Sequence, residues 1–183
     1  MMLFSAVAGS CEGGSSEPRA ELSAVEAEIN FCYKHVAETH EWQGAVLESS
    51  GDAPLEITRI LLRGDAGCAF GVFREAASGE EPGAYPVPPE EEPGEPISMV
   101  LAPGQVAFLE VVYDPPAAGE TDSAAIVVHG ATSDPEQGRL VIPLCGVGLA
   151  PGETSPTAPD AGSDGGPDCP PCEQLDEGAP WCQ

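Results

Sequence analysis

Apolar and polar residues alternate along short runs between about residue 25 and residue 148, and turn residues separate the runs. The clearest run is VAFLEVVY: alternate residues from Ala107 onward lie on one face, and Val106, Phe108 and Glu110 lie on the other. A period of two is typical of a half-buried strand. Such runs recur every 8–12 residues or so, which predicts an all-β protein, an immunoglobulin-like β-sandwich of about seven to eight strands.

Three segments interrupt this pattern and set the expected domain organisation. Residues 1–26 start apolar and continue as a Gly/Ser-rich stretch, which predicts a disordered tether, with one short helical turn within residues 19–28. Residues 80–96 hold six prolines and show no period, so we expect a surface loop insertion that is partly extended and too polar to pack. Residues 150–183 hold seven prolines and no basic residue, which predicts a disordered acidic tail. The sandwich is therefore expected at residues 27–149.

The charge balance excludes one class of partner. The chain has 31 acidic and 6 basic residues, a formal net charge of −25. Such a field repels the phosphates of nucleic acids and the headgroups of anionic lipids. We therefore expect no nucleic-acid partner, and a membrane association only through a covalent lipid. Nothing in the sequence indicates an oligomer, and we expect a monomer.

The first eleven residues, MMLFSAVAGSC, resemble the end of a bacterial lipoprotein signal. Small residues precede Cys11, as they precede the cysteine that becomes lipidated in a lipobox, and a Gly/Ser-rich stretch follows it. The segment departs from that pattern in having no Lys or Arg before the apolar run and in carrying Ala8 where Leu is usual. We expect export and lipidation of Cys11.

The chain has seven cysteines, a number typical of an oxidising compartment. Lipidation of Cys11 would leave six that could pair, although sequence cannot assign their connectivity. Cys169 and Cys172 have a C-x-x-C spacing, but too few further ligands for zinc lie nearby, so we expect one of them to bond Cys182. The candidate disulfide cysteines are Cys32, Cys68, Cys145, Cys169, Cys172 and Cys182.

No arrangement of residues indicates a metal, a cofactor or catalysis. His35 and His40 fall on opposite faces of a strand, and His129 is expected at an exposed strand end. Asp160 to Asp168 match part of a calcium-loop pattern, but positions 3 and 12 of that pattern are Gly162 and Pro171, which supply no ligand side chain. Arg63-Gly64-Asp65 spells an adhesion tripeptide that we interpret as a turn. No nucleophile elbow, phosphate loop or zinc motif is present, and we predict a non-enzymatic protein without a cofactor.

The order of landmarks along the chain resembles one family. A strand is followed by a Ser-Gly turn and Pro-Leu, and a later Pro-Gly turn precedes a strand that ends in aromatic-x-Pro; these landmarks are INF at 29–31, VLESSGDAPLEITRILLRGD at 46–65, CAF at 68–70, APGQVAFLEVVYDPPAAGE at 102–120, and the closing IVVHG and VIPLCGVG. Together they resemble the abnormal-spindle and Hydin (ASH) immunoglobulin-like domains, relatives of the major sperm protein and PapD-like sandwiches. The loop at 80–96 is longer than in that family.

The resemblance implies scaffolding or adhesion and no catalytic residues. Its bacterial members resemble surface proteins of the choice-of-anchor D type, and its eukaryotic members are ciliary and centrosomal. We expect an exported lipoprotein module that binds a protein partner through an edge strand, either residues 139–146 or residues 28–35. Two alternatives stay open: an intracellular scaffold with reduced cysteines, and a calcium-dependent adhesion module.

Overall fold

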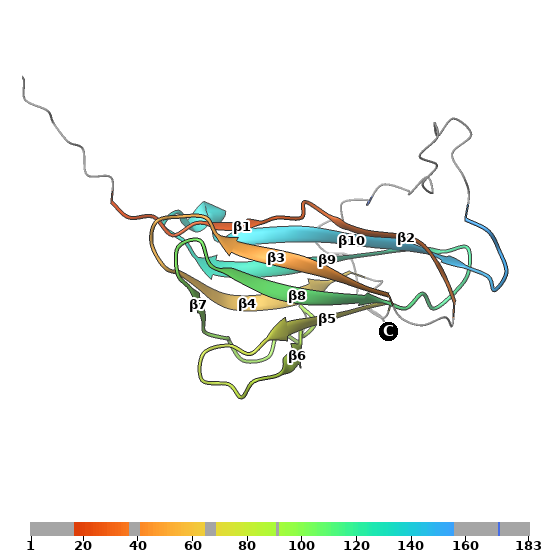
Figure 1. Ribbon diagram of the computed structural model, residues 1–183, viewed down its shortest axis with the longest axis horizontal. Helices are drawn as coiled ribbons and strands as arrows, with labels where there is room; N and C mark the ends of the chain where they lie inside the picture. The colour runs from red at the N-terminus through yellow and green to blue at the C-terminus, as the bar shows by residue number, and fades with distance from the viewer. Residues whose placement is uncertain (1–16, 37–40, 65–68, 91, 156–171, 173–183) are drawn as a thin grey trace, which may run out of the picture.

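A computed structural model describes residues 17–36, 41–64, 69–90, 92–155 and 172 of the 183-residue chain. These residues form two five-stranded sheets, which confirms the predicted all-β sandwich (Figure 1). Sheet A has the strand order β1-β3-β8-β5-β6, and sheet B the order β2-β10-β9-β4-β7. The strands are β1 (Leu22–Ala24), β2 (Ile29–His35), β3 (Glu41–Ser49), β4 (Leu55–Arg63), β5 (Phe70–Glu75), β6 (Ala84–Pro86), β7 (Met99–Leu101), β8 (Val106–Tyr113), β9 (Thr121–Ala131) and β10 (Arg139–Leu149).

The core lies between the sheets and follows the predicted alternation. In β8, Ala107, Leu109 and Val111 are buried, while Val106 and Phe108 are exposed. All neighbouring strands are antiparallel except β2, which runs parallel to β10. With few aromatic residues available, mainly aliphatic side chains fill the interior, as composition requires. The described residues hold ten strands, and those beyond the predicted seven to eight are short ones of three residues.

One buried polar contact joins the two sheets. The Tyr113 hydroxyl of β8 donates to an Asp122 carboxylate oxygen of β9 at 2.7 Å, and both side chains are buried. Burial, together with this hydrogen bond, raises the pKa of the Tyr113 phenol well above its ordinary value. The Tyr113 ring lies against Gly146, where an added Cβ would come within 2.4 Å of it. Gly146 therefore gives the ring the space that it occupies.

The segment at residues 80–96 is more ordered than predicted. Its residues Ala84–Pro86 form β6 at the edge of sheet A, and Val87 is buried in the core. Beyond β6 the chain reaches sheet B, where Leu62 N–H donates to the Pro88 carbonyl and Glu90 N–H donates to the Leu62 carbonyl. The segment is partly extended in β6, as predicted. The expectation that it is too polar to pack is wrong, because Val87 enters the core and backbone hydrogen bonds hold the residues after it.

The ends of the sandwich also differ from the expected boundaries. Residues 22–24 form β1, paired with β3, where a helical turn was expected, so the sandwich begins before residue 27. At the C-terminal side β10 ends at Leu149, as predicted. Residues 1–16 and most of the predicted tail, 156–171 and 173–183, lie outside the described residues.

Candidate functional site

The outer face of sheet A carries several apolar side chains on neighbouring strands. Trp42, Phe108 and Val106 are 55%, 50% and 41% exposed. The strand register places further apolar residues next to these: Val112 lies opposite Trp42, and Val46 lies opposite Phe108. The ring of Phe73, from β5, lies 5.9 Å from the Trp42 ring. Single exposed apolar residues are ordinary, but a contiguous group on one face marks an interaction surface.

A gap and a carboxylate lie within this apolar face. Gly44 sits between Trp42 and Val46 on β3 and leaves its position without a side chain. A Cβ built there would meet no atom closer than the Leu109 carbonyl oxygen at 3.9 Å, so the position has room for a Cβ atom. Glu110 of β8 lies directly opposite Gly44 and is exposed. We call the position without a side chain at Gly44, between Trp42 and Val46 and opposite Glu110, the Gly44 gap.

Basic side chains are absent from this face in the part of the chain that the structure describes. The basic residue of β5, Arg74, points into the protein, where it binds the Glu80 carboxylate and lies 4.9 Å from the Tyr85 ring. Its guanidinium and the Ala77 N–H hold the pKa of Glu80 at about 2. Glu48 and Glu75 add negative charge at the ends of β3 and β5. The apolar face is therefore bordered by acids.

The outer face of sheet B has a different composition. Arg59, His129 and Arg139 lie directly opposite one another across β4, β9 and β10. Burial and the neighbouring arginines lower the pKa of His129. His129 is half-buried rather than at an exposed strand end as predicted. Arg63, at the end of β4, binds the Glu90 carboxylate through two hydrogen bonds. The acidic segment is thus fastened to the basic part of this face.

The Cys145–Cys172 disulfide fixes one residue of the tail to sheet B. Its Cα atoms are 5.3 Å apart, and the Cys172 sulfur lies 3.8 Å from the Ile29 carbonyl oxygen of β2. Of the two expected pairings with Cys182, the one through Cys172 is therefore wrong, because Cys172 pairs with Cys145, which lies beside Asn30 near the sheet edge. The pairing of Cys169 with Cys182 lies outside the described residues. Cys32 is also disulfide-bonded. Of the other predicted cysteines, Cys11, Cys68, Cys169 and Cys182 lie outside the described residues.

The sheet edges do not match the expected docking strands. β10, which contains residues 139–146, lies inside sheet B between β2 and β9, so the prediction that it forms an edge is wrong. β2 is an edge, as predicted, but two of its backbone groups bind side chains: the Asn30 carbonyl accepts from the Gln43 side chain, and Cys32 N–H donates to the Asn30 side chain. Cys32 also has a positive φ of 53°, which interrupts the strand. The remaining edges β1, β6 and β7 are three residues long. Interrupted and short edges disfavour strand addition.

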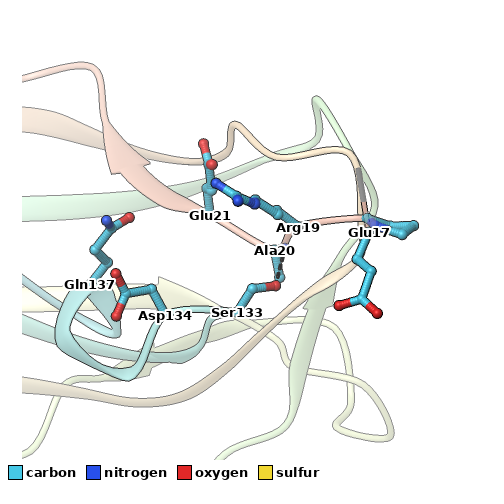
Figure 2. Close-up of a pocket in the computed structure, with 8 residues that line it drawn as sticks. Glu17, Arg19, Ala20, Glu21, Ser133, Asp134 and Gln137 are labelled. Atoms are coloured by element: carbon cyan, nitrogen blue, oxygen red, sulfur yellow. Dashed lines mark hydrogen bonds between the residues drawn. The ribbon is translucent and has the colours of Figure 1, made fainter. Parts of the chain in front are cut away.

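A hollow of about 450 Å³ lies between residues 17–21 and the turn at residues 133–137 (Figure 2). Ala20 N–H donates to the Ser133 hydroxyl, which ties the two segments together. The Asp134 carboxylate accepts a hydrogen bond from Glu136 N–H and caps the short 3-10 helix η2 (Pro135–Gln137). Figure 2 shows the carboxylates of Glu17, Glu21 and Asp134 pointing apart rather than toward one point. The hollow therefore has no converging ligand groups.

The other sequence-predicted chemistry is only partly placed. His35 is bonded through Nδ1 to the Ala150 carbonyl at 3.0 Å, while His40 lies outside the described residues. Arg63 of the adhesion tripeptide is held by Glu90, and Asp65 is outside the described residues. So are Asp160 to Asp168 of the calcium-like pattern. Among the described residues, no three His, Cys, Asp or Glu side chains converge as metal ligands, and no helix is long and apolar enough to cross a bilayer.

Several solved structures match the chain at low sequence identity. The match to the ASH/PapD-like domain 7 of human CEP192 has 13% sequence identity and a TM-score of 0.44. It covers 81% of this chain and 99% of that domain. The match to the E. coli chaperone DraB has 12% identity and a TM-score of 0.41, and it covers 78% of this chain and 61% of the chaperone. The match to the periplasmic chaperone SfaE has 7% identity and a TM-score of 0.43, and it covers 74% of this chain and 60% of the chaperone.

No protein-family model matches the chain, and no curated protein is similar to it. The chain spans about three fifths of the two chaperones. With identities of 13% or less and TM-scores below 0.5, these matches assign no family to the chain. The immunoglobulin-like sandwich is assigned from the two sheets themselves.

Sequence reasoning missed the apolar outer face of sheet A, although its signal was present. The run VAFLEVVY has apolar residues on both of its faces, whereas a strand with one solvated face has polar residues on that side. The same holds for β3, where Trp42 and Val46 face outward and Ala45 and Leu47 inward. Apolar residues on both faces of two adjacent strands predict that the outer face, like the inner one, packs against another segment or another molecule.

Proposed function

We propose that this protein is a non-catalytic, exported module that binds another protein through the outer face of sheet A. The observation that carries the proposal is the exposure of Trp42, Val106 and Phe108 on one face of the sheet. Large aromatic side chains in a contiguous patch are the residues that most often dominate protein–protein binding energy. The engaged edge of β2 and the short edges elsewhere favour this face over strand addition.

The cysteines support export. The Cys145–Cys172 disulfide needs an oxidising compartment, which an intracellular scaffold with reduced cysteines would lack. A lipid on Cys11 would hold the module at a cell surface, with the residues up to Glu17 as a tether. Mass spectrometry of the protein expressed in a bacterium tests this part. Seven free thiols in the denatured, unreduced protein would contradict export, and an unmodified Cys11 would contradict the anchor.

Site-specific photocrosslinking tests the binding face. A photoreactive phenylalanine analogue replaces Phe108 in the full-length chain, and the matched control carries it at Val141, which is 38% exposed on sheet B. In cells of the source organism we expect a defined protein adduct from position 108 and none from position 141. Excess wild-type protein should compete the adduct away, whereas a Phe108→Ser variant should not. Adducts of equal yield from both positions would contradict the proposal.

A further inference from the structure

We infer that the partner inserts a lysine or arginine side chain into the Gly44 gap. The inference rests on the proposed function, because it specifies what the outer face of sheet A binds. Gly44 removes one side chain from an otherwise apolar row, and Glu110 is its direct cross-strand neighbour. Directly opposite positions in an antiparallel pair are about 5 Å apart at Cβ. A side chain that enters the gap therefore lies beside the Glu110 carboxylate.

The walls of the gap select an aliphatic stem that ends in a cation. Trp42 and Val46 border the gap along β3, and Phe108 lies diagonally across it on β8. Lysine and arginine pack their methylene groups on apolar surface while the charged end stays at a polar group. The indole face of Trp42 also attracts a cation, and arginine stacks on such faces. An uncharged aliphatic side chain would fill the gap but would leave Glu110 partly desolvated without a partner.

The charge of the surroundings points to a basic partner segment rather than to a second copy. Glu110 forms no ion pair with any described residue, and Glu48 lies further along the same face. The Glu26 carboxylate, which accepts a hydrogen bond from Val46 N–H at 2.8 Å, adds charge at the border of β3. Two copies packed face to face would bring these carboxylates together, each on a chain of net charge −25. Like charges at an interface oppose such pairing.

Three matched peptides test the inference. The acetylated and amidated heptapeptide Ser-Val-Leu-Xaa-Val-Leu-Ser carries Lys, norleucine or Glu at its centre. Binding is followed by the fluorescence of Trp42 in a full-length Trp181→Phe variant, so that one indole reports. We expect the Lys peptide to bind at least fivefold more tightly than the norleucine peptide, and the Glu peptide to bind most weakly. The advantage of Lys should shrink as salt rises, because an exposed ion pair is screened.

Two variants locate the effect. Glu110→Gln should abolish the preference for Lys over norleucine. Gly44→Val should weaken all three peptides at least fivefold while leaving the fold intact, because the gap has room for a side chain and valine suits a strand. Circular dichroism and thermal unfolding check that both variants are folded. Val141→Ser, on the other sheet, is the matched control and should change nothing.

The outcomes separate this inference from the function beneath it. Equal binding of the Lys and norleucine peptides, or a Lys preference that survives Glu110→Gln, overturns the inference. If those peptides still lose binding in Phe108→Ser, the face remains a protein-binding surface and only the cation is wrong. A concentration-dependent dimer in sedimentation velocity that Phe108→Ser abolishes would also overturn the inference, because the occupant would be a second copy.

Discussion

The outer faces of sheet A and sheet B both belong to five-stranded sheets but are used differently by the chain. Sheet B is covered in part by the protein itself. Cys172 forms a disulfide with Cys145, and Glu90 forms a hydrogen-bonded ion pair with Arg63. On the outer face of sheet A, no disulfide or ion pair between described residues holds a covering segment, and Trp42 and Phe108 are exposed instead. The difference indicates that the outer face of sheet B contributes to the stability of the fold, whereas that of sheet A is available to a partner.

The largest effect should come from the disulfide on sheet B. Cys172→Ser opens a loop with a sequence separation of 27 residues. We expect the free energy of unfolding to fall by about 3 kcal/mol, since the cross-link restricts the unfolded chain. Urea unfolding of the oxidised proteins measures the difference. The reduced proteins should have nearly equal stability, and an equal loss with and without reductant would show that the disulfide is not responsible.

The contact between Tyr113 and Asp122 belongs to both sheets and serves as a reference for the comparison. Tyr113→Phe leaves a buried carboxylate without its donor, which should cost about 2 kcal/mol. The raised pKa of Tyr113 adds a pH signature. The unfolded phenol ionises near its ordinary value of 10.0 while the folded one keeps its proton, so the wild type should lose stability as the pH rises above 10.

Unfolding of the two proteins at pH 7 and in steps above pH 10 tests this reference. Tyr113→Phe should lack the part of the alkaline loss that comes from this phenol. Parallel pH profiles of wild type and variant would contradict the assignment.

Glu90 on sheet B should have a smaller effect. Glu90→Gln removes the charge that pairs with Arg63, and we expect a loss of about 1 kcal/mol at neutral pH for this partly exposed pair. Arg63 holds the pKa of Glu90 below its ordinary value of 4.5. The contribution is therefore present above pH 4.5 and is lost as the pH falls further. Thermal unfolding across the acid range should show wild type and variant converging, and a constant difference would argue against the ion pair.

The smallest effect on stability should come from sheet A. Phe108→Ser removes an exposed ring from the outer face, and we expect a change within about 0.5 kcal/mol. The same substitution should abolish the crosslinked adduct and weaken the peptides. A loss of stability as large as that of Cys172→Ser would remove the distinction between the two faces, because Phe108 would then support the fold.

The strand pattern of the fold could be predicted from the sequence better than the functional surfaces could. Alternation in the run VAFLEVVY gave the correct inward and outward sides, because side-chain period and burial are directly linked in a strand. The pairing of Cys145 with Cys172 could not be predicted, since it depends on where the chain returns after Leu149. The interior position of β10 depends on β2 lying parallel beside it, a long-range pairing that local pattern does not encode. Residues 80–96 were misjudged because their order comes from backbone hydrogen bonds and two ion pairs.

The Cys145–Cys172 bond has a consequence for the chain as a covalent object. A protease that cuts any peptide bond between these two residues produces two polypeptides that remain joined through sulfur. Such a nicked molecule would migrate as one species on a non-reducing gel and separate into two after reduction. The body of the sandwich and everything that follows Cys172 would therefore stay together after cleavage, for as long as the surroundings remain oxidising.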